Sequence, residues 1–99
     1  MKSFSISTES SVAFASRVNT ALNGRTLGSF VSVEGRPDAF FVRFDRLGKS
    51  EVEYAVTPVG DGFRAELKKE SIAFAHRPFR TEIEGKLRKL VEKHGGKAS

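Results

Sequence analysis

The chain has 99 residues, of which 38% are hydrophobic and 29% charged, and nine are phenylalanine. This composition is typical of one folded domain with a single core and excludes a disordered chain. There is no cysteine, which excludes disulfides, a thiolate nucleophile and zinc–thiolate sites. The formal charge of +5 is uneven, because residues 76–99 hold seven Lys or Arg against three Asp or Glu, whereas residues 1–75 hold ten against nine. No uncharged run approaches the length of a bilayer span and the first residues lack a secretory signal, so we expect a cytoplasmic protein.

The first two predicted elements are a strand and a helix. In "SFSIS", residues 3–7, Phe4 and Ile6 alternate with serines, which is the period of a half-buried strand. A short amphipathic helix follows at about residues 10–23, with possible Ser or Thr caps before it and Asn23 and Gly24 as its stop. Its apolar residues recur at helical spacing: Phe14, Ala15, Val18, Ala21 and Leu22.

Four extended segments come next, at residues 27–33, 39–45, 51–56 and 63–67. Their short connections predict an antiparallel meander, and "VGDGF" predicts a tight hairpin in which Asp61 and Gly62 adopt positive φ. One face of the meander is expected to form the core, and it holds Val31, Val33, Phe40, Val42, Phe44, Val52, Tyr54, Val56, Phe63, Ala65 and Leu67.

Residues 69–77 fit either a strand or a helical turn, and the sequence does not decide between them. Pro78 suits the first turn of a closing helix whose apolar arc comprises Phe79, Ile83, Leu87, Leu90 and Val91. We therefore predict a single α+β domain over residues 1–94, of order β-α-β-β-β-β-α, and a frayed tail at 95–99. It consists of an antiparallel sheet of about five strands, with a long C-terminal amphipathic helix and the shorter helix packed on the same face.

The charges of the closing helix have local explanations. Glu82 precedes Lys86 by four residues, and Glu84 precedes Arg88 by four, which favours pairing within the helix. Lys89, Lys93 and His94 lie near the helix end, where its carbonyls favour cations. We interpret this side of the helix as solvated and self-paired, with an anion-binding face as the alternative.

The segment "VRFDRLGKSEVEYAVTPVGDGFRAEL", followed by "FRTEIEGKLRKLVE", resembles the end of small helix-grip (START-like) domains, including those of polyhydroxyalkanoate systems. The resemblance implies a curled antiparallel sheet closed by one amphipathic helix, with room for a small apolar cavity between them. The residues expected to line such a cavity are Tyr54, Phe63, Phe74, Phe79, Ile83 and Leu87. The alternative is that these side chains simply fill the core.

The opposite face of the sheet suggests a second type of partner. If the alternating valines and phenylalanines point inward, Phe30 and Phe41 point outward, where aromatic rings beside arginines could stack on unpaired bases. The residues of this candidate nucleic-acid face are Phe30, Phe41, Arg43, Arg64 and Lys68. We favour the alternative that the aromatic rings pack on each other, beneath a loop, or against a second copy in a homodimer.

No arrangement of residues predicts catalysis. His76 and His94 have no metal-ligand or catalytic spacing, Glu51 and Glu53 lie on the polar side of a strand, and the glycines form no phosphate-binding loop. We therefore predict a non-enzymatic binding module without metal or cofactor. Its expected partner is an apolar small molecule or a protein surface, held between the sheet and the closing helix; the alternative partner is nucleic acid.

Overall fold

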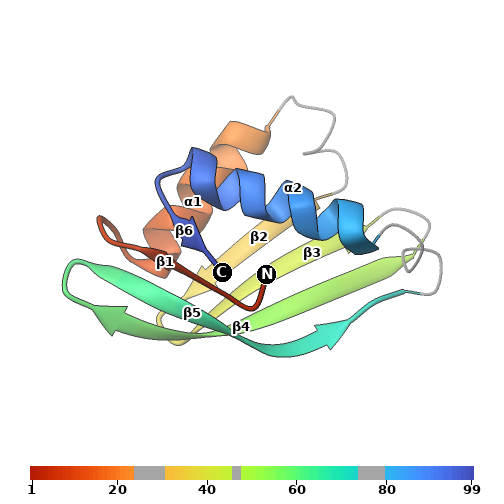
Figure 1. Ribbon diagram of the computed structural model, residues 1–99. Helices are drawn as coiled ribbons and strands as arrows, with labels where there is room; N and C mark the ends of the chain where they lie inside the picture. The colour runs from red at the N-terminus through yellow and green to blue at the C-terminus, as the bar shows by residue number, and fades with distance from the viewer. Residues whose placement is uncertain (24–30, 46–47, 74–79) are drawn as a thin grey trace.

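The alternating and helical patterns of apolar residues produce an antiparallel sheet with two helices on one of its faces (Figure 1). The computed structural model describes residues 1–23, 31–45, 48–73 and 80–99. Within these residues, no helix combines the length and hydrophobicity of a membrane-spanning segment. In chain order the elements are β1 (Ser3–Ile6), α1 (Ser11–Leu22), β2 (Val31–Arg36), β3 (Ala39–Asp45), β4 (Lys49–Val59), β5 (Gly62–Ser71), α2 (Arg80–Lys93) and β6 (Lys97–Ala98). The α+β class is confirmed, but the sheet has six strands rather than about five.

The strands are ordered β2-β3-β4-β5-β1-β6, and all neighbours are antiparallel. Strands β2 to β5 form the predicted meander, whereas β1 joins the sheet beside β5, with Ile6 opposite Phe63. Gly62 permits this close approach, because a Cβ at that position would lie 1.8 Å from the carbonyl oxygen of Ile6. The sheet curls around the two helices, so that its concave face becomes the core (Figure 1).

Aromatic side chains fill the middle of the core. The ring centroid of Phe4 lies 5.2–6.2 Å from those of Phe14, Phe40, Tyr54 and Phe63, which come from α1 and three other strands. Edge-to-face and tilted contacts at these distances add to the stabilisation that burial itself provides. The predicted inward face of β2, β3 and β4 is confirmed, since its valines and aromatic residues are all buried.

Helix α1 lies along the edge strand β2 and caps its outer backbone groups. The side-chain amide of Asn19 donates to the carbonyl oxygen of Val33 at 2.7 Å, and the Val33 N–H donates to Asn19 Oδ1 at 3.1 Å. The Ser11 hydroxyl donates to the carbonyl oxygen of Arg36. Gly35 allows this approach, because a Cβ there would lie 2.1 Å from the Ser11 carbonyl oxygen. The helix thereby blocks the pairing of another strand along this part of the edge.

Strands β4 and β5 form the predicted hairpin, with Val59 opposite Gly62. Gly60 has a positive φ (58°), whereas Gly62, one of the two residues predicted to have one, does not, because it already belongs to β5. Strand β5 continues to residue 71, so the first part of the ambiguous segment is extended. Leu67, predicted to lie in the core, is 38% exposed because it sits at the mouth of a cavity described below.

Helix α2 ends in a Schellman motif that turns the chain back toward the sheet. The Gly96 N–H donates to the Val91 carbonyl at 2.9 Å and the Gly95 N–H to the Glu92 carbonyl at 3.1 Å, with Gly95 at a φ of 90°. The chain then forms β6, which pairs with β1. The expected frayed tail at 95–99 is therefore replaced by a turn and a strand. The expected long C-terminal helix is wrong as well, because α2 has 14 residues against 12 in α1 and is not the last element.

Candidate functional site

A cavity of about 280 Å³ lies between the sheet and α2, and we call it the sheet cavity. It occupies the region in which the resemblance to helix-grip domains implied a ligand site. Its wall is mainly apolar, and Leu67 at its mouth is partly exposed to solvent. The lining residues are Met1, Lys2, Val52, Tyr54, Leu67, Glu70, Ile72, Glu84 and Leu87.

Tyr54 contributes a ring and a hydroxyl to this wall. The hydroxyl donates to the carbonyl oxygen of Met1 at 2.8 Å, and the side chain is almost fully buried. Burial is the main cause that raises the pKa of Tyr54 to about 12; the nearby Glu70 carboxylate contributes to this increase and Arg88 opposes it. The phenol is therefore neutral at physiological pH, and its proton is hydrogen-bonded to the Met1 carbonyl oxygen. It adds a polar group to the cavity wall and does not act as an acid or base.

The structure brings two of the six predicted cavity residues together in the sheet cavity, Tyr54 and Leu87. Phe63 is buried in the aromatic core instead and does not line the cavity. Of the other predicted cavity residues, Phe74 and Phe79 are not among the described residues, and the side chain of Ile83 is not described. Phe30 of the candidate nucleic-acid face is likewise not among the described residues.

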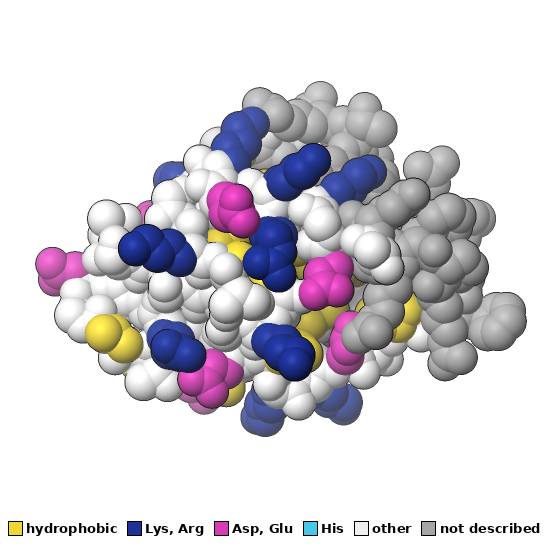
Figure 2. Space-filling model, viewed as in Figure 1, with side chains coloured by type: hydrophobic (Ala, Val, Ile, Leu, Met, Phe, Trp, Pro, Cys, Tyr) yellow, Lys and Arg dark blue, Asp and Glu magenta, His cyan; other side chains and the backbone are white. Residues whose placement is uncertain are grey.

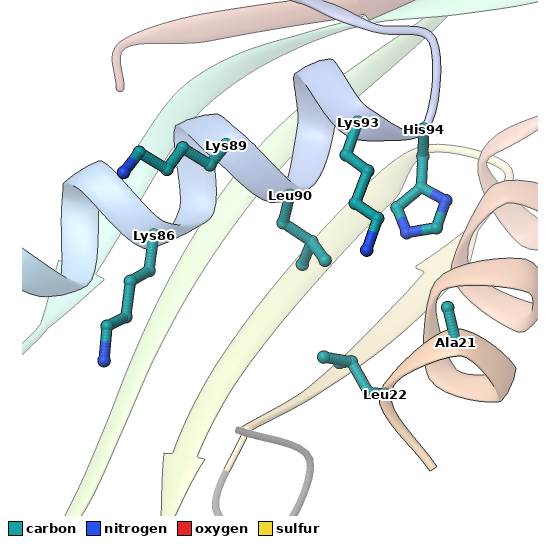
Figure 3. Close-up of a pocket in the computed structure, with 7 residues that line it drawn as sticks. All are labelled: Ala21, Leu22, Lys86, Lys89, Leu90, Lys93 and His94. Atoms are coloured by element: carbon teal, nitrogen blue, oxygen red, sulfur yellow. The ribbon is translucent and has the colours of Figure 1, made fainter. Parts of the chain in front are cut away.

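A second cavity, also of about 280 Å³, lies between the last turns of α1 and the second half of α2, and we call it the interhelix groove. Its apolar part comes from α1 and from Leu90 of α2, and its charged part comes from lysines of α2. In Figure 3, Leu90, Lys93 and His94 point from α2 toward the end of α1. The lining residues are Ala21, Leu22, Lys86, Lys89, Leu90, Lys93 and His94.

The pairing predicted within α2 differs from the pairing in the structure. Glu84 pairs with the N-terminal ammonium group. No ion pair within 4.0 Å joins Glu84 to Arg88, so that predicted pair is not formed. The predicted pair of Glu82 and Lys86 lies outside the description, because the Glu82 side chain is not described.

The outer face of the sheet carries Phe41 under a cover of arginines. Phe41 is only 8% exposed, because the guanidinium carbons of Arg36 and Arg43 each lie 5.0 Å from its ring centroid. Arg43 bonds to Glu34 at 2.6 Å and to Glu51 at 2.7 Å. The hydrogen bond from Arg43, and to a smaller extent the one from Arg36, holds the pKa of Glu34 below its usual value. A base that stacked on Phe41 would have to displace at least one of these paired arginines.

The other described residues of the predicted nucleic-acid face do not gather around Phe41. Arg43 and Arg64 lie opposite positions 51 and 57 of β4. These positions are about 20 Å apart along the strand at roughly 3.3 Å per residue. Lys68 pairs with Glu53 at 3.6 Å, so a carboxylate of the neighbouring strand partly neutralises the charge of this lysine. The outer face is therefore an ion-paired surface with separated cations.

The ionisable residues considered for chemistry have structural partners. Glu51 and Glu53 each pair with a basic side chain of a neighbouring strand. His94 Nδ1 lies 3.3 Å from Nη1 of Arg17, which links the middle of α1 to the end of α2, and His76 lies outside the described residues. Within the part of the chain that the structure describes, no three His, Asp or Glu residues form a group that could hold a metal ion.

The interhelix groove was not identified from the sequence. One available signal was the spacing of Lys86, Lys89 and Lys93, which places three cations on the same side of a helix around Leu90. The contribution of Leu22 could not be found in this way, because it depends on how α1 packs against α2.

Comparisons of the chain with known protein families, with curated proteins and with solved structures gave no match. The resemblance to helix-grip domains therefore stays a prediction from the sequence pattern.

Proposed function

We propose that the protein is a small non-enzymatic binding module that holds an apolar small molecule in the sheet cavity. The observation that carries this proposal is the cavity itself: about 280 Å³ of space beside Val52, Tyr54 and Leu87, in a chain whose core is otherwise filled by aromatic rings. Protein interiors are normally close-packed, so a space of this size lined by apolar side chains favours an occupant.

The chemistry of the wall favours an uncharged, apolar ligand. Val52, Ile72 and Leu87 offer only dispersion contacts, and the Tyr54 hydroxyl is already bonded to a backbone carbonyl. The charged groups of the lining, Glu70 and Glu84 against Lys2 and the N-terminal ammonium, balance one another and favour neither an anionic nor a cationic ligand. The cavity is close to the lower end of the range for ligand sites, about 300 Å³, which favours a small molecule over a protein side chain with its attached backbone.

Native mass spectrometry of the freshly purified chain provides a first test. We expect a ligand-bound species with one apolar molecule per chain, which organic extraction removes and identifies. Incubation of the extracted protein with decan-1-ol, an uncharged apolar probe, should restore a one-to-one complex. Failure to bind decan-1-ol, or any member of a series of shorter and branched alcohols, would contradict the proposal.

A matched pair of variants locates the ligand. Leu67→Gln makes the mouth of the sheet cavity polar, and it should weaken decan-1-ol binding about three- to tenfold through partial loss of one leucine contact. Val59→Gln is the control, because Val59 is 60% exposed in the same hairpin and does not line the cavity. Equal weakening by both variants would show that the probe binds elsewhere.

A further inference from the structure

The interhelix groove differs from the sheet cavity in its charge. Leu22 is buried and Leu90 is partly buried, so the floor of the groove is apolar. Lys86, Lys89 and Lys93 are exposed and lie around that floor, and no Asp or Glu is among the described residues that line it. Figure 2 shows Lys and Arg side chains spread over the side of the molecule that carries α2, with some Asp or Glu side chains and hydrophobic surface between them.

The carboxylates that the structure describes do not form ion pairs with these lysines. Among the described residues, no ion pair within 4.0 Å involves Lys86, Lys89 or Lys93. Three like charges on one side of a helix repel one another, which destabilises the helix. An anion placed between them would reverse this effect.

The end of α2 does not require these lysines as hydrogen-bond donors. The carbonyls of Val91 and Glu92 accept from the two glycines that follow the helix, and the His94 carbonyl accepts from Arg17 at 2.7 Å. Arg17 is itself paired with Glu9. The helix end is thus capped by other groups, which leaves the lysine side chains available for a ligand.

We propose that the interhelix groove binds a small amphiphile with an anionic head group, such as a medium-chain carboxylate. The apolar chain of the ligand would lie on Leu22, Leu90 and Ala21, and the head group would lie among the lysine ammonium groups. This site is separate from the sheet cavity, because the two lie on opposite flanks of α2 and share none of the lining residues that the structure describes.

Calorimetry and methyl NMR with decanoate test this site. We expect saturable binding, with shifts of the Ala21, Leu22 and Leu90 methyl signals, that weakens as salt rises and screens the lysines. Decan-1-ol should not shift these signals at the same concentration, because it lacks the charged head group. A parallel binding experiment with vesicles of phosphatidylcholine and phosphatidylglycerol shows whether the site binds a free amphiphile or a lipid surface.

Charge-matched variants provide the controls. Lys89→Gln/Lys93→Gln should weaken decanoate binding about two- to thirtyfold, the range expected for two exposed charge contacts. Lys49→Gln/Lys69→Gln removes the same net charge from exposed positions of β4 and β5, and should leave the affinity unchanged.

The proposal would be overturned by an absence of decanoate binding at millimolar concentration or by equal weakening in both double variants. Equally tight binding of decan-1-ol in the groove, or binding to vesicles without binding to free decanoate, would overturn it as well. Decanoate shifts at Val52 and Leu87 instead would assign the anion to the sheet cavity. That result would overturn the groove site but leave the proposed function standing.

Discussion

Replacing Leu87 by alanine tests whether the sheet cavity exists beside α2. Leu87 is 6% exposed and lines the cavity, so truncation removes three buried carbons, worth about 2.4 kcal/mol of transfer free energy at roughly 0.8 kcal/mol each. Leucine-to-alanine changes in closely packed cores cost about 2.7–5 kcal/mol, because a new cavity adds to the transfer term. Space already exists on one side of Leu87, so fewer contacts are lost there. We therefore expect a loss of about 2–3 kcal/mol.

Urea denaturation followed by circular dichroism measures this loss, provided that the slope of the unfolding free energy against urea is unchanged. Val91→Ala is the matched control: Val91 lies one turn later on α2, is 4% exposed and does not line the sheet cavity. The loss of unfolding free energy per carbon removed should be larger for Val91→Ala than for Leu87→Ala. Decan-1-ol should also stabilise Leu87→Ala more than wild type, because the enlarged cavity leaves more room for the ligand.

Two outcomes would refute this reasoning. A loss of about 4–5 kcal/mol for Leu87→Ala would show a closely packed site with no space beside it. A loss well under 1 kcal/mol would show that α2 does not bury this side chain against the sheet.

Three further predictions concern other parts of the fold. Gly35→Ala should destabilise the protein by about 1–3 kcal/mol, because the new Cβ would lie 2.1 Å from the Ser11 carbonyl oxygen. Gly85→Ala should stabilise α2 by about 0.5–1 kcal/mol, because the space around this glycine is open. Thermal unfolding of both variants measures this contrast. Tyr54 is the only tyrosine and there is no tryptophan, so ultraviolet absorbance should report its pKa of about 12 in the folded chain and about 10 in denaturant. Because the folded pKa is the higher one, the stabilisation linked to this phenol, at most about 3 kcal/mol, is complete below pH 10 and is lost as pH rises through 12. An unshifted titration would contradict its burial. Oligonucleotide binding, measured by fluorescence anisotropy, should be weak and should disappear between about 50 and 200 mM salt. It should be unchanged in Phe41→Ala. Salt-tolerant binding that required Phe41 would instead support the nucleic-acid alternative.

The parts of the fold that depend on local patterns were predictable. Strand β3 was predicted with its exact bounds, Ala39–Asp45, and the helix predicted at 10–23 is α1 with Ser10 as its N-cap. Alternation also identified the inward faces of the first three meander strands, because one residue in two must be buried when one side of a sheet is covered.

The parts that depend on register or on packing between elements were not predictable. Strand β6 has two residues, too few for any periodicity, and exists because the turn at Gly95 directs it onto β1. Phe41 was assigned correctly to the outer face, but its cover by Arg36 and Arg43 depends on how these side chains bend across the ring. Both cavities likewise arise from the placement of α2 against α1 and the sheet, which no local pattern in the sequence specifies.

Methyl NMR of the wild-type chain during titration with decan-1-ol tests the central claim most directly, because it reports where the ligand lies as well as whether it binds. We predict saturable shifts of Val52, Leu67, Ile72 and Leu87, reaching completion at one molecule per chain. No saturable shift of any methyl signal, or shifts confined to residues outside the sheet cavity, would contradict the claim that this cavity holds an apolar ligand.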